Sequence, residues 1–171
     1  DDEGLQSKVV LEIIKWLAND PDVPKLTPAD LHTRAYRIAR EITGNPDPFR
    51  NLKKISNEIA IRVLPVLQRE VDGLENFEDK FRLAALGTIC GNAIDFEIED
   101  YQVSIESIEP FLVGCLKGDL AIDDTSKLMK MLSRSRKVLY LLDNAGEIVF
   151  DKFFIKMIAE KYPAAVTVVV K

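Results

Sequence analysis

The chain has 171 residues, of which 47% are hydrophobic and 30% are charged, and its formal net charge is -5. This length fits one domain with a sizeable core or two small ones, and the composition is typical of a globular protein. The Lys and Arg residues are scattered, so no basic stripe indicates a nucleic-acid polymer as partner. No apolar run reaches the roughly 20 residues that a membrane span needs.

Residues 1–136 are predicted to form a helical domain. Apolar residues recur at helical spacing over 5–19. Thr27 and Pro28 have the residue types of an N-cap and a first helical position, for a helix that ends near Gly44. Further helices are predicted from the turn at 45–48 through residue 70, where Pro65 should kink or split the helix, and over 77–89, 104–116 and 124–132.

The stretch around Cys90 also contains GNAID, residues 91–95. In its plain interpretation, Gly91 ends the helix over 77–89, Asn92 takes a left-handed turn and Asp95 caps the next segment. Cys90 and Cys115 are widely separated and lie in apolar surroundings. We therefore expect two buried thiols in a reducing cytosol, rather than a disulfide, and a cytoplasmic protein.

At Lys137 the hydrophobic period changes. A strand over 137–142, a helix over 147–162 and a strand over 165–170 predict a βαβ unit with two parallel strands. The predicted fold class is α+β, with a helical domain at 1–136 followed by the start of an α/β domain at 137–171. A parallel sheet needs more than two strands, so we expect the sequence to be the front part of a larger protein.

Polar residues DNAGE, at 143–147, follow the first strand directly. Ligands of open parallel sheets bind at this edge, and Asp143 and Asn144 offer oxygen donors that suit Mg²⁺ or Mn²⁺. Gly146 would let a ligand approach the backbone closely, and the amides of the first helical turn are expected to be open to a phosphate. The plain alternative is that Asp143 or Asn144 only caps the helix.

Two acids follow at helical spacing. Glu147 and Asp151 are four residues apart and share one helix face. Each also has a plain interpretation, Glu147 as a first-turn acid that favours the helix dipole and Asp151 as an exposed helical acid. His32 is the only His in the sequence and is read as an ordinary helix residue, which disfavours a Ser-His-Asp or Cys-His arrangement.

Three segments occur in order: EITGNPDPFRNLKK at 41–54, GNAIDF at 91–96 and LLDNAGEIVFD at 141–151. This set resembles the metal-dependent damage-control phosphatases, in particular the archaeal-type subfamily, over essentially the whole chain. The resemblance implies a helical N-terminal part and a C-terminal α/β/α sandwich. It also implies hydrolysis of phosphomonoesters with a divalent cation such as Mn²⁺, Ni²⁺, Co²⁺ or Mg²⁺.

The resemblance assigns roles residue by residue. Asp143 and Asn144 match two of the three metal ligands, and Glu147 would orient a water or act as an acid–base group. Asn92, Asp95 and Gly146 would line the substrate cleft. The third ligand, an Asp, and a phosphate-binding Lys are expected beyond residue 171, and the Cys-x-x-Cys that the subfamily usually has near its start is absent here.

The expected substrate is a small phosphorylated metabolite, with damaged purine nucleotides favoured over sugar phosphates. Three other functions stay open. Relatives of this type have been proposed to methylate acidic side chains with S-adenosylmethionine. A phosphatase with Asp143 as covalent nucleophile normally has a second Asp two residues later, and Ala145 disfavours it. The third alternative is a non-enzymatic helical interaction module.

Overall fold

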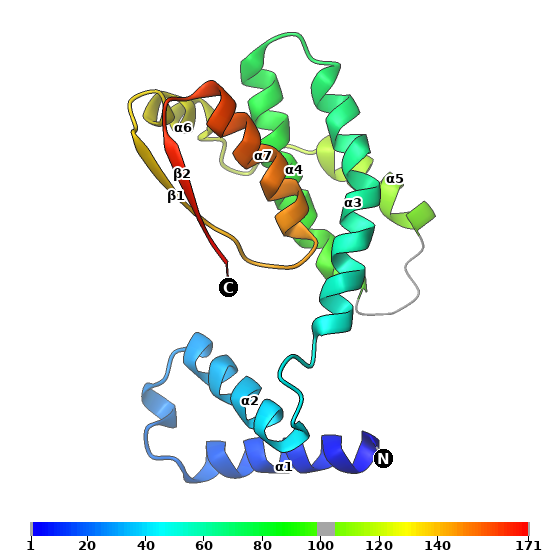
Figure 1. The fold of residues 1–171 in the computed structure, drawn as a ribbon, viewed down its shortest axis with the longest axis vertical. Coiled ribbons are helices and arrows are strands. Elements are labelled where there is room, and N and C mark those ends of the chain that lie inside the picture. The colour runs from blue at the N-terminus through cyan, green and yellow to red at the C-terminus, as the bar shows by residue number, and fades with distance from the viewer. Residues whose placement is uncertain (1, 99–104, 171) are drawn as a thin grey trace. The chain divides into compact units, whose positions relative to one another are not determined.

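The computed structural model describes residues 2–98 and 105–170, with the backbone alone for residues 2, 93–98 and 105–107. Helices dominate these residues and two β-strands accompany them, which confirms the predicted α+β class (Figure 1). The elements are α1 (Asp2–Asn19), the short 3-10 helix η1 (Val23–Lys25), α2 (Pro28–Thr43), α3 (Arg50–Asp72), α4 (Phe77–Ile98), α5 (Ile105–Leu116), α6 (Thr125–Leu132), β1 (Lys137–Leu141), α7 (Glu147–Lys161) and β2 (Ala165–Val169).

Residues 1–50 form a first compact unit, in which α1 packs against α2. As predicted, Thr27 caps α2. Its side chain accepts a hydrogen bond from the backbone N–H of Asp30, and the Asp30 carboxylate accepts one from the Thr27 N–H. Gly44 follows the helix with φ 63°, in the left-handed region that Gly adopts without steric penalty. The start and the end of α2 are therefore fixed by local residues.

The chain from Asn51 onward forms a second compact unit, which holds the main hydrophobic core. At its centre the ring of Phe81 lies 4.8 Å from that of Phe154 and 6.3 Å from that of Tyr162, between centroids. Figure 1 shows α7 lying along α4, and residues of α3, α5 and α6 complete the core. The largest fully buried side chains are Phe81, Phe150, Leu67, Ile108, Leu112, Val63 and Cys90.

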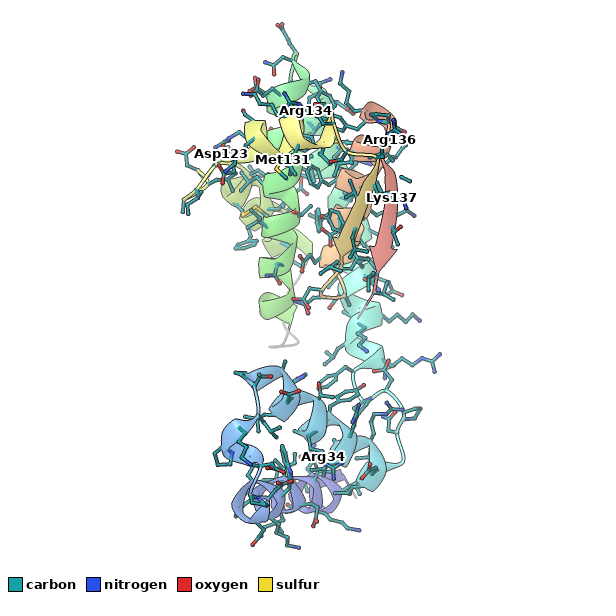
Figure 2. The ribbon with its side chains drawn as sticks, turned by 90° about the vertical axis from the view of Figure 1, so that its left-hand side faces the viewer. Arg34, Asp123, Met131, Arg134, Arg136 and Lys137 are labelled. Atoms are coloured by element: carbon teal, nitrogen blue, oxygen red, sulfur yellow. A yellow bond between two sulfur atoms is a disulfide. The ribbon has the colours of Figure 1, made fainter. Side chains whose placement is uncertain are left out.

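The two strands pair in parallel, and α7 is the crossover between them, as predicted. The register pairs Lys137 with Ala165 and Leu141 with Val169. Figure 2 labels Lys137, the first residue of β1. Along β1 the side chains alternate in exposure, because Val138 and Tyr140 pack against the core while Leu139 and Leu141 are 64% and 69% exposed.

One prediction about a helix end is wrong. α4 continues through Gly91 to Ile98, so Gly91 is no helix end and Asn92 takes no left-handed turn. A Cβ on Gly91 would lie 2.6 Å from Cδ2 of Phe150, so the missing side chain lets α7 approach α4 closely. α3 continues past Pro65 as one helix, so Pro65 does not split it, and a kink at this residue stays a prediction.

A disulfide joins Cys90 of α4 to Cys115 of α5, so the prediction of two free thiols is wrong. The packing of α5 against α4 brings the two sulfur atoms together, although 25 positions separate the residues. Sequence spacing gave no sign of this contact. The cytoplasmic location stays a prediction.

The packing divides the chain differently from the predicted boundary near residue 136. Every described element before Lys137 is helical and the βαβ unit follows, as predicted by element type. However, α4 and α7 lie on opposite sides of that boundary and share one core. The compact units divide after Arg50 instead, so the βαβ unit is built onto α3 and α4.

Candidate functional site

Residues 143–147, the site loop, lead from the carboxyl end of β1 into α7. Strand pairing continues up to the loop, since the Leu142 N–H donates a hydrogen bond to the Val169 carbonyl oxygen at 2.9 Å. Asp143 is exposed, whereas Gly146 is buried and has φ 84° and ψ -62°. Residues other than Gly are strained at this φ. The loop therefore presents Asp143 to solvent and turns the backbone inward at Gly146, one residue before α7 begins.

Asn144 contacts Asn92 of α4. Its Nδ2 donates a hydrogen bond to Asn92 Oδ1 at 3.0 Å. The two polar clusters that the sequence suggested, GNAID and DNAGE, therefore meet in the fold. The contact uses the amide nitrogen of Asn144, so Oδ1 is not one of its atoms.

Sequence reasoning missed two residues of α3 that hold the loop, Ser56 and Asn57. The backbone N–H of Gly146 donates a hydrogen bond to Asn57 Oδ1 at 2.8 Å. Ser56 is 2% exposed, and a Cβ on Gly146 would lie 3.4 Å from the Ser56 Cβ. The available signal was two adjacent residues of low helix propensity inside an otherwise amphipathic helix.

The expectation that the first-turn amides of α7 are open to a phosphate is wrong for three of them. The Gly146 N–H is bound by Asn57. The Ile148 N–H donates to the Asn144 carbonyl at 3.2 Å, and the Val149 N–H donates to the Gly146 carbonyl at 3.1 Å. Gly146 is also covered by Ser56, so the backbone here is used to build the loop. The substrate-binding role of Gly146 stays a prediction.

Asp151 is buried, with 3% of its surface exposed, so its interpretation as an exposed helical acid is wrong. It accepts a hydrogen bond from the Tyr140 hydroxyl of β1 at 2.7 Å. Burial raises the pKa of the Asp151 carboxyl, an effect that this hydrogen bond partly offsets. Burial also raises the pKa of Tyr140, and its contacts with Asp151 and the charge of Glu147 add to the shift. Tyr140 therefore stays a protonated donor that ties β1 to α7.

Glu147 begins α7, one turn before Asp151 on the same helix face. Its side chain is half-buried, and the Oε2 atom is inaccessible to solvent. The charge of Glu147 acts on the hydroxyl of Tyr140, which places the carboxylate near the Tyr140–Asp151 pair. The side chain of Asp95 lies outside the described residues, and His32 is an exposed residue of α2, as expected.

The donors of the site loop fit a hard divalent cation. Asp143 is exposed and has a carboxylate, and the next residue has an amide oxygen that the contact with Asn92 does not use. Such ions prefer oxygen ligands, and Mg²⁺ in particular is often held by one or two side chains, waters and substrate phosphates. Among the side chains that the structure describes, at 3–92 and 108–170, no three His, Cys, Asp or Glu residues are placed to hold a metal ion. The described residues therefore offer two adjacent donors.

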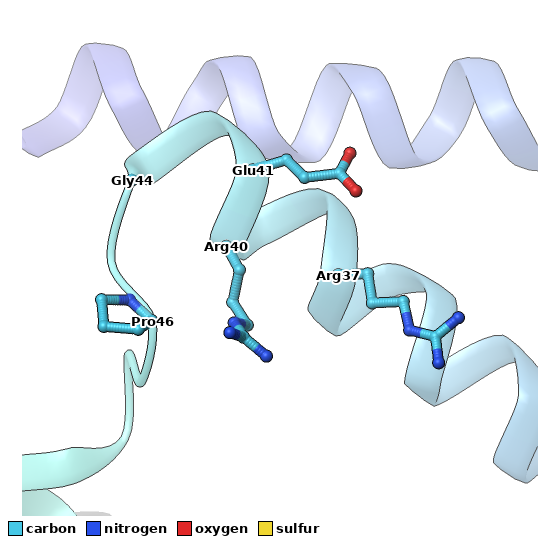
Figure 3. A pocket seen from close by; sticks show the side chains of 5 residues that line it. All are labelled: Arg37, Arg40, Glu41, Gly44 and Pro46. Carbon is cyan, nitrogen blue, oxygen red and sulfur yellow. The ribbon is translucent and has the colours of Figure 1, made fainter.

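A separate hollow lies at the C-terminal end of α2, in the first unit. Figure 3 shows its lining, which encloses about 390 Å³ and consists of Arg37, Arg40, Glu41, Gly44 and Pro46. The Arg40 guanidinium lies 5.9 Å from the centre of the Tyr36 ring. All five lining residues are exposed, and none of them is a predicted site residue. This hollow is therefore no part of the candidate site.

Comparison with known proteins identifies relatives along the whole chain. Residues 1–171 match the damage-control phosphatase ARMT1-like domain. An uncharacterized protein of Methanocaldococcus jannaschii is 35% identical over 176 residues, covering 100% of this chain and 55% of that protein. A protein of Archaeoglobus fulgidus named damage-control phosphatase is 37% identical over 161 residues, covering 94% of this chain and 54% of the relative.

The fold has a counterpart among solved structures. The crystal structure of a DUF89 family protein from Pyrococcus horikoshii superimposes with a TM-score of 0.78 at 30% sequence identity, covering 98% of this chain and 55% of that one. The chain thus spans about half the length of the relatives that it matches. Because the domain match extends over all 171 residues and the fold agrees, the chain belongs to the damage-control phosphatase ARMT1-like family.

Proposed function

We propose that this protein is a divalent-metal-dependent phosphatase that hydrolyses small phosphorylated metabolites. Membership of the family supports a phosphatase, and the relative from Archaeoglobus fulgidus is named damage-control phosphatase. The observation that carries the proposal is the contact between Asn144 and Asn92. It joins the two polar clusters, and Asp143 precedes Asn144 in the loop at the edge of the sheet where ligands bind.

In this proposal, Asp143 and Asn144 hold the cation. Mn²⁺, Ni²⁺, Co²⁺ and Mg²⁺ are all compatible with oxygen donors of this kind. A bound divalent cation would withdraw charge from the phosphate oxygens and favour attack by water. The third ligand, an Asp, and a phosphate-binding Lys are proposed to follow residue 171, as the resemblance implies.

The remaining residues would act on the substrate and on the attacking water. Glu147 lies in the first turn of α7, and we assign it the orientation of this water or the acid–base step. Asn92 and Asp95 would line the substrate cleft from α4, and Gly146 would line it from the site loop. The partly buried position of Glu147 supports its role, because a carboxylate shielded from solvent interacts more strongly with nearby charge.

For the substrate we propose damaged purine nucleotides ahead of sugar phosphates. A cation site recognises a phosphate group whatever it is attached to, so the structure of the leaving group must be read by other residues. The net charge of -5 and the scattered Lys and Arg residues disfavour nucleic-acid polymers, which need many cationic contacts. Within the described ranges, no helix is both long and apolar enough to cross a membrane.

The test uses full-length protein with each of the four cations and a chromogenic phosphate ester, followed by a panel of nucleotides and sugar phosphates. The wild-type protein should release phosphate only when a cation is present. Asp143→Ala should lose both cation binding and phosphate release while its helical circular dichroism stays unchanged. Asp124→Ala removes an exposed aspartate of the same unit and should behave as the wild type.

Two results would contradict the proposal. Cation affinity that survives in Asp143→Ala would show that this carboxylate is no ligand. A folded, cation-loaded protein that cleaves none of the esters but transfers a methyl group from S-adenosylmethionine would replace the phosphatase with a carboxyl methyltransferase.

A further inference from the structure

The hydrogen bond between Asn57 and Gly146 reaches from α3 into the middle of the site loop. We propose that Asn57 is a positioning residue, which acts through the Gly146 amide to hold Asp143 and Asn144 in the geometry of a cation site. The inference rests on the proposed function in that it takes these two residues as the ligands. Asn57 itself is assigned no contact with cation or substrate.

The direction of this bond is fixed by chemistry. A backbone N–H can only donate, so the atom of Asn57 that lies 2.8 Å from the Gly146 nitrogen must be its Oδ1. In a trans peptide the N–H and the preceding C=O point in opposite directions. The bond therefore sets the plane of the peptide between Ala145 and Gly146, one residue after Asn144.

The packing around Gly146 makes this acceptor hard to replace. Gly146 is buried, and its backbone lies against Ser56, which is 2% exposed. A buried N–H that loses its partner keeps its desolvation penalty, so the loop would move to find another acceptor. Gly146 has φ 84°, where a backbone without a Cβ has many accessible alternatives. The hydrogen bond selects one of them.

A second contact limits the loop from another helix. The Asn144 side chain is bound to Asn92 of α4, while the Gly146 backbone is bound to Asn57 of α3. Only Ala145 separates the two bound residues. Fixing both leaves the ligand pair at 143 and 144 little freedom, and partners outside the ligand shell typically change cation affinity 10–100-fold when they are removed.

The experiment compares three variants of the full-length protein. Asn57→Leu keeps the approximate volume but has no acceptor, Asn57→Asp keeps an acceptor oxygen in place, and Asn57→Ala serves in case the leucine variant does not fold. Asn51→Leu, at an exposed position of the same helix, is the control. The readouts are the exchange rate of the Gly146 amide in protein labelled with ¹⁵N-glycine, Mn²⁺ affinity by calorimetry, and helical circular dichroism.

We expect the Gly146 amide of Asn57→Leu, or of Asn57→Ala, to exchange at least about tenfold faster and Mn²⁺ to bind about 10–100-fold more weakly, with helical content retained. Asn57→Asp should restore slow exchange, and Asn51→Leu should match the wild type. Unchanged exchange and affinity in the acceptor-free variants would overturn the inference. So would Asn57→Asp behaving like Asn57→Leu, because the acceptor would then be irrelevant.

The two proposals fail in different ways. A wild-type protein that binds no Mn²⁺ contradicts the proposed function. Asn57 would then have no cation ligands to position, although it could still order the loop. Wild-type binding that is unaffected by the loss of the Asn57 acceptor contradicts the positioning role alone.

Discussion

The two compact units differ in what holds them together. The first, residues 1–50, buries Ile38 among its described side chains, and Val10, Leu11, Ile14 and Leu17 of α1 are 42–57% exposed. The second contains the aromatic cluster, the disulfide and the contacts of Asn144 and Gly146 with α4 and α3. Local capping thus defines the helices of the first unit, whereas burial between distant segments defines the second. The candidate site belongs to the second type of structure.

The largest expected effect comes from the centre of the second core. Phe81 is fully buried against Phe154 and Tyr162, so Phe81→Ala should lower the free energy of unfolding of this unit by about 3–5 kcal/mol. Trp16 is the only Trp of the sequence and lies in the first unit, so its fluorescence reports that unit separately. Urea titration should shift the circular dichroism transition and leave the Trp16 transition in place. A common shift of both signals would show that the units unfold as one.

The disulfide gives the next largest effect. It closes a loop of 25 positions between Cys90 and Cys115. Such a cross-link stabilises the folded state by about 3 kcal/mol, because it lowers the conformational entropy of the unfolded chain. Reduction with dithiothreitol should lower the urea midpoint of the second unit and leave that of Trp16 unchanged. The double variant Cys90→Ala, Cys115→Ala is the control, because it should be insensitive to reductant. A wild-type midpoint that does not respond to full reduction would contradict this estimate.

The cap of α2 tests the first unit. Thr27→Ala removes the acceptor for the Asp30 N–H and should cost about 1 kcal/mol, which the Trp16 signal reports and the core of the second unit does not. Thr33→Ala, at an exposed position inside the same helix, is a matched control that should not destabilise. An equal loss for both variants would mean that the cap has no special role.

The smallest expected effect is on the stability of the second unit at acid pH. Hydrogen bonds from Thr125 and from the Arg82 guanidinium, 2.5 Å away, lower the pKa of Asp123 (labelled in Figure 2) from 3.8 to about 2. Because the folded pKa is depressed, the contribution is present above pH 3.8 and is lost as the pH falls toward 2. Asp123→Asn should flatten the stability curve of the second unit between about pH 4 and 2. An unchanged acid slope in this variant would contradict the assignment.

The sequence predicted those features that depend on neighbouring residues. The N-cap at Thr27, the end of α2 near Gly44 and the βαβ unit all follow from local pattern. The predictions were wrong where a contact with a residue distant in the sequence determines the local structure. Gly91 has the local signs of a helix end, but the close packing of Phe150 keeps it inside α4.

The candidate site shows the same limit. The polar residues at 143–147 were found from the sequence because they directly follow an apolar strand, whereas the site role of Asn92 came from the family resemblance. Asn57 was missed, because an Asn inside a helix predicts no particular contact until the position of the site loop beside that helix is known. The burial of Asp151 depends likewise on its contact with Tyr140. Alternation along β1 places Tyr140 on one face of the strand, but which face is the core side is known only once the position of the covering helix is known.

The contacts of the site loop also bear on the order of folding. Asn92 and Asn144 are 52 positions apart, and Asn57 and Gly146 are 89 positions apart. Contacts over such separations form only after the entropy of long loops has been lost, whereas the capping box of α2 joins residues three positions apart and forms within one turn. The loop is therefore expected to take its final shape late, after α3, α4 and α7 have docked. In refolding experiments, cation affinity should return after the helical signal does.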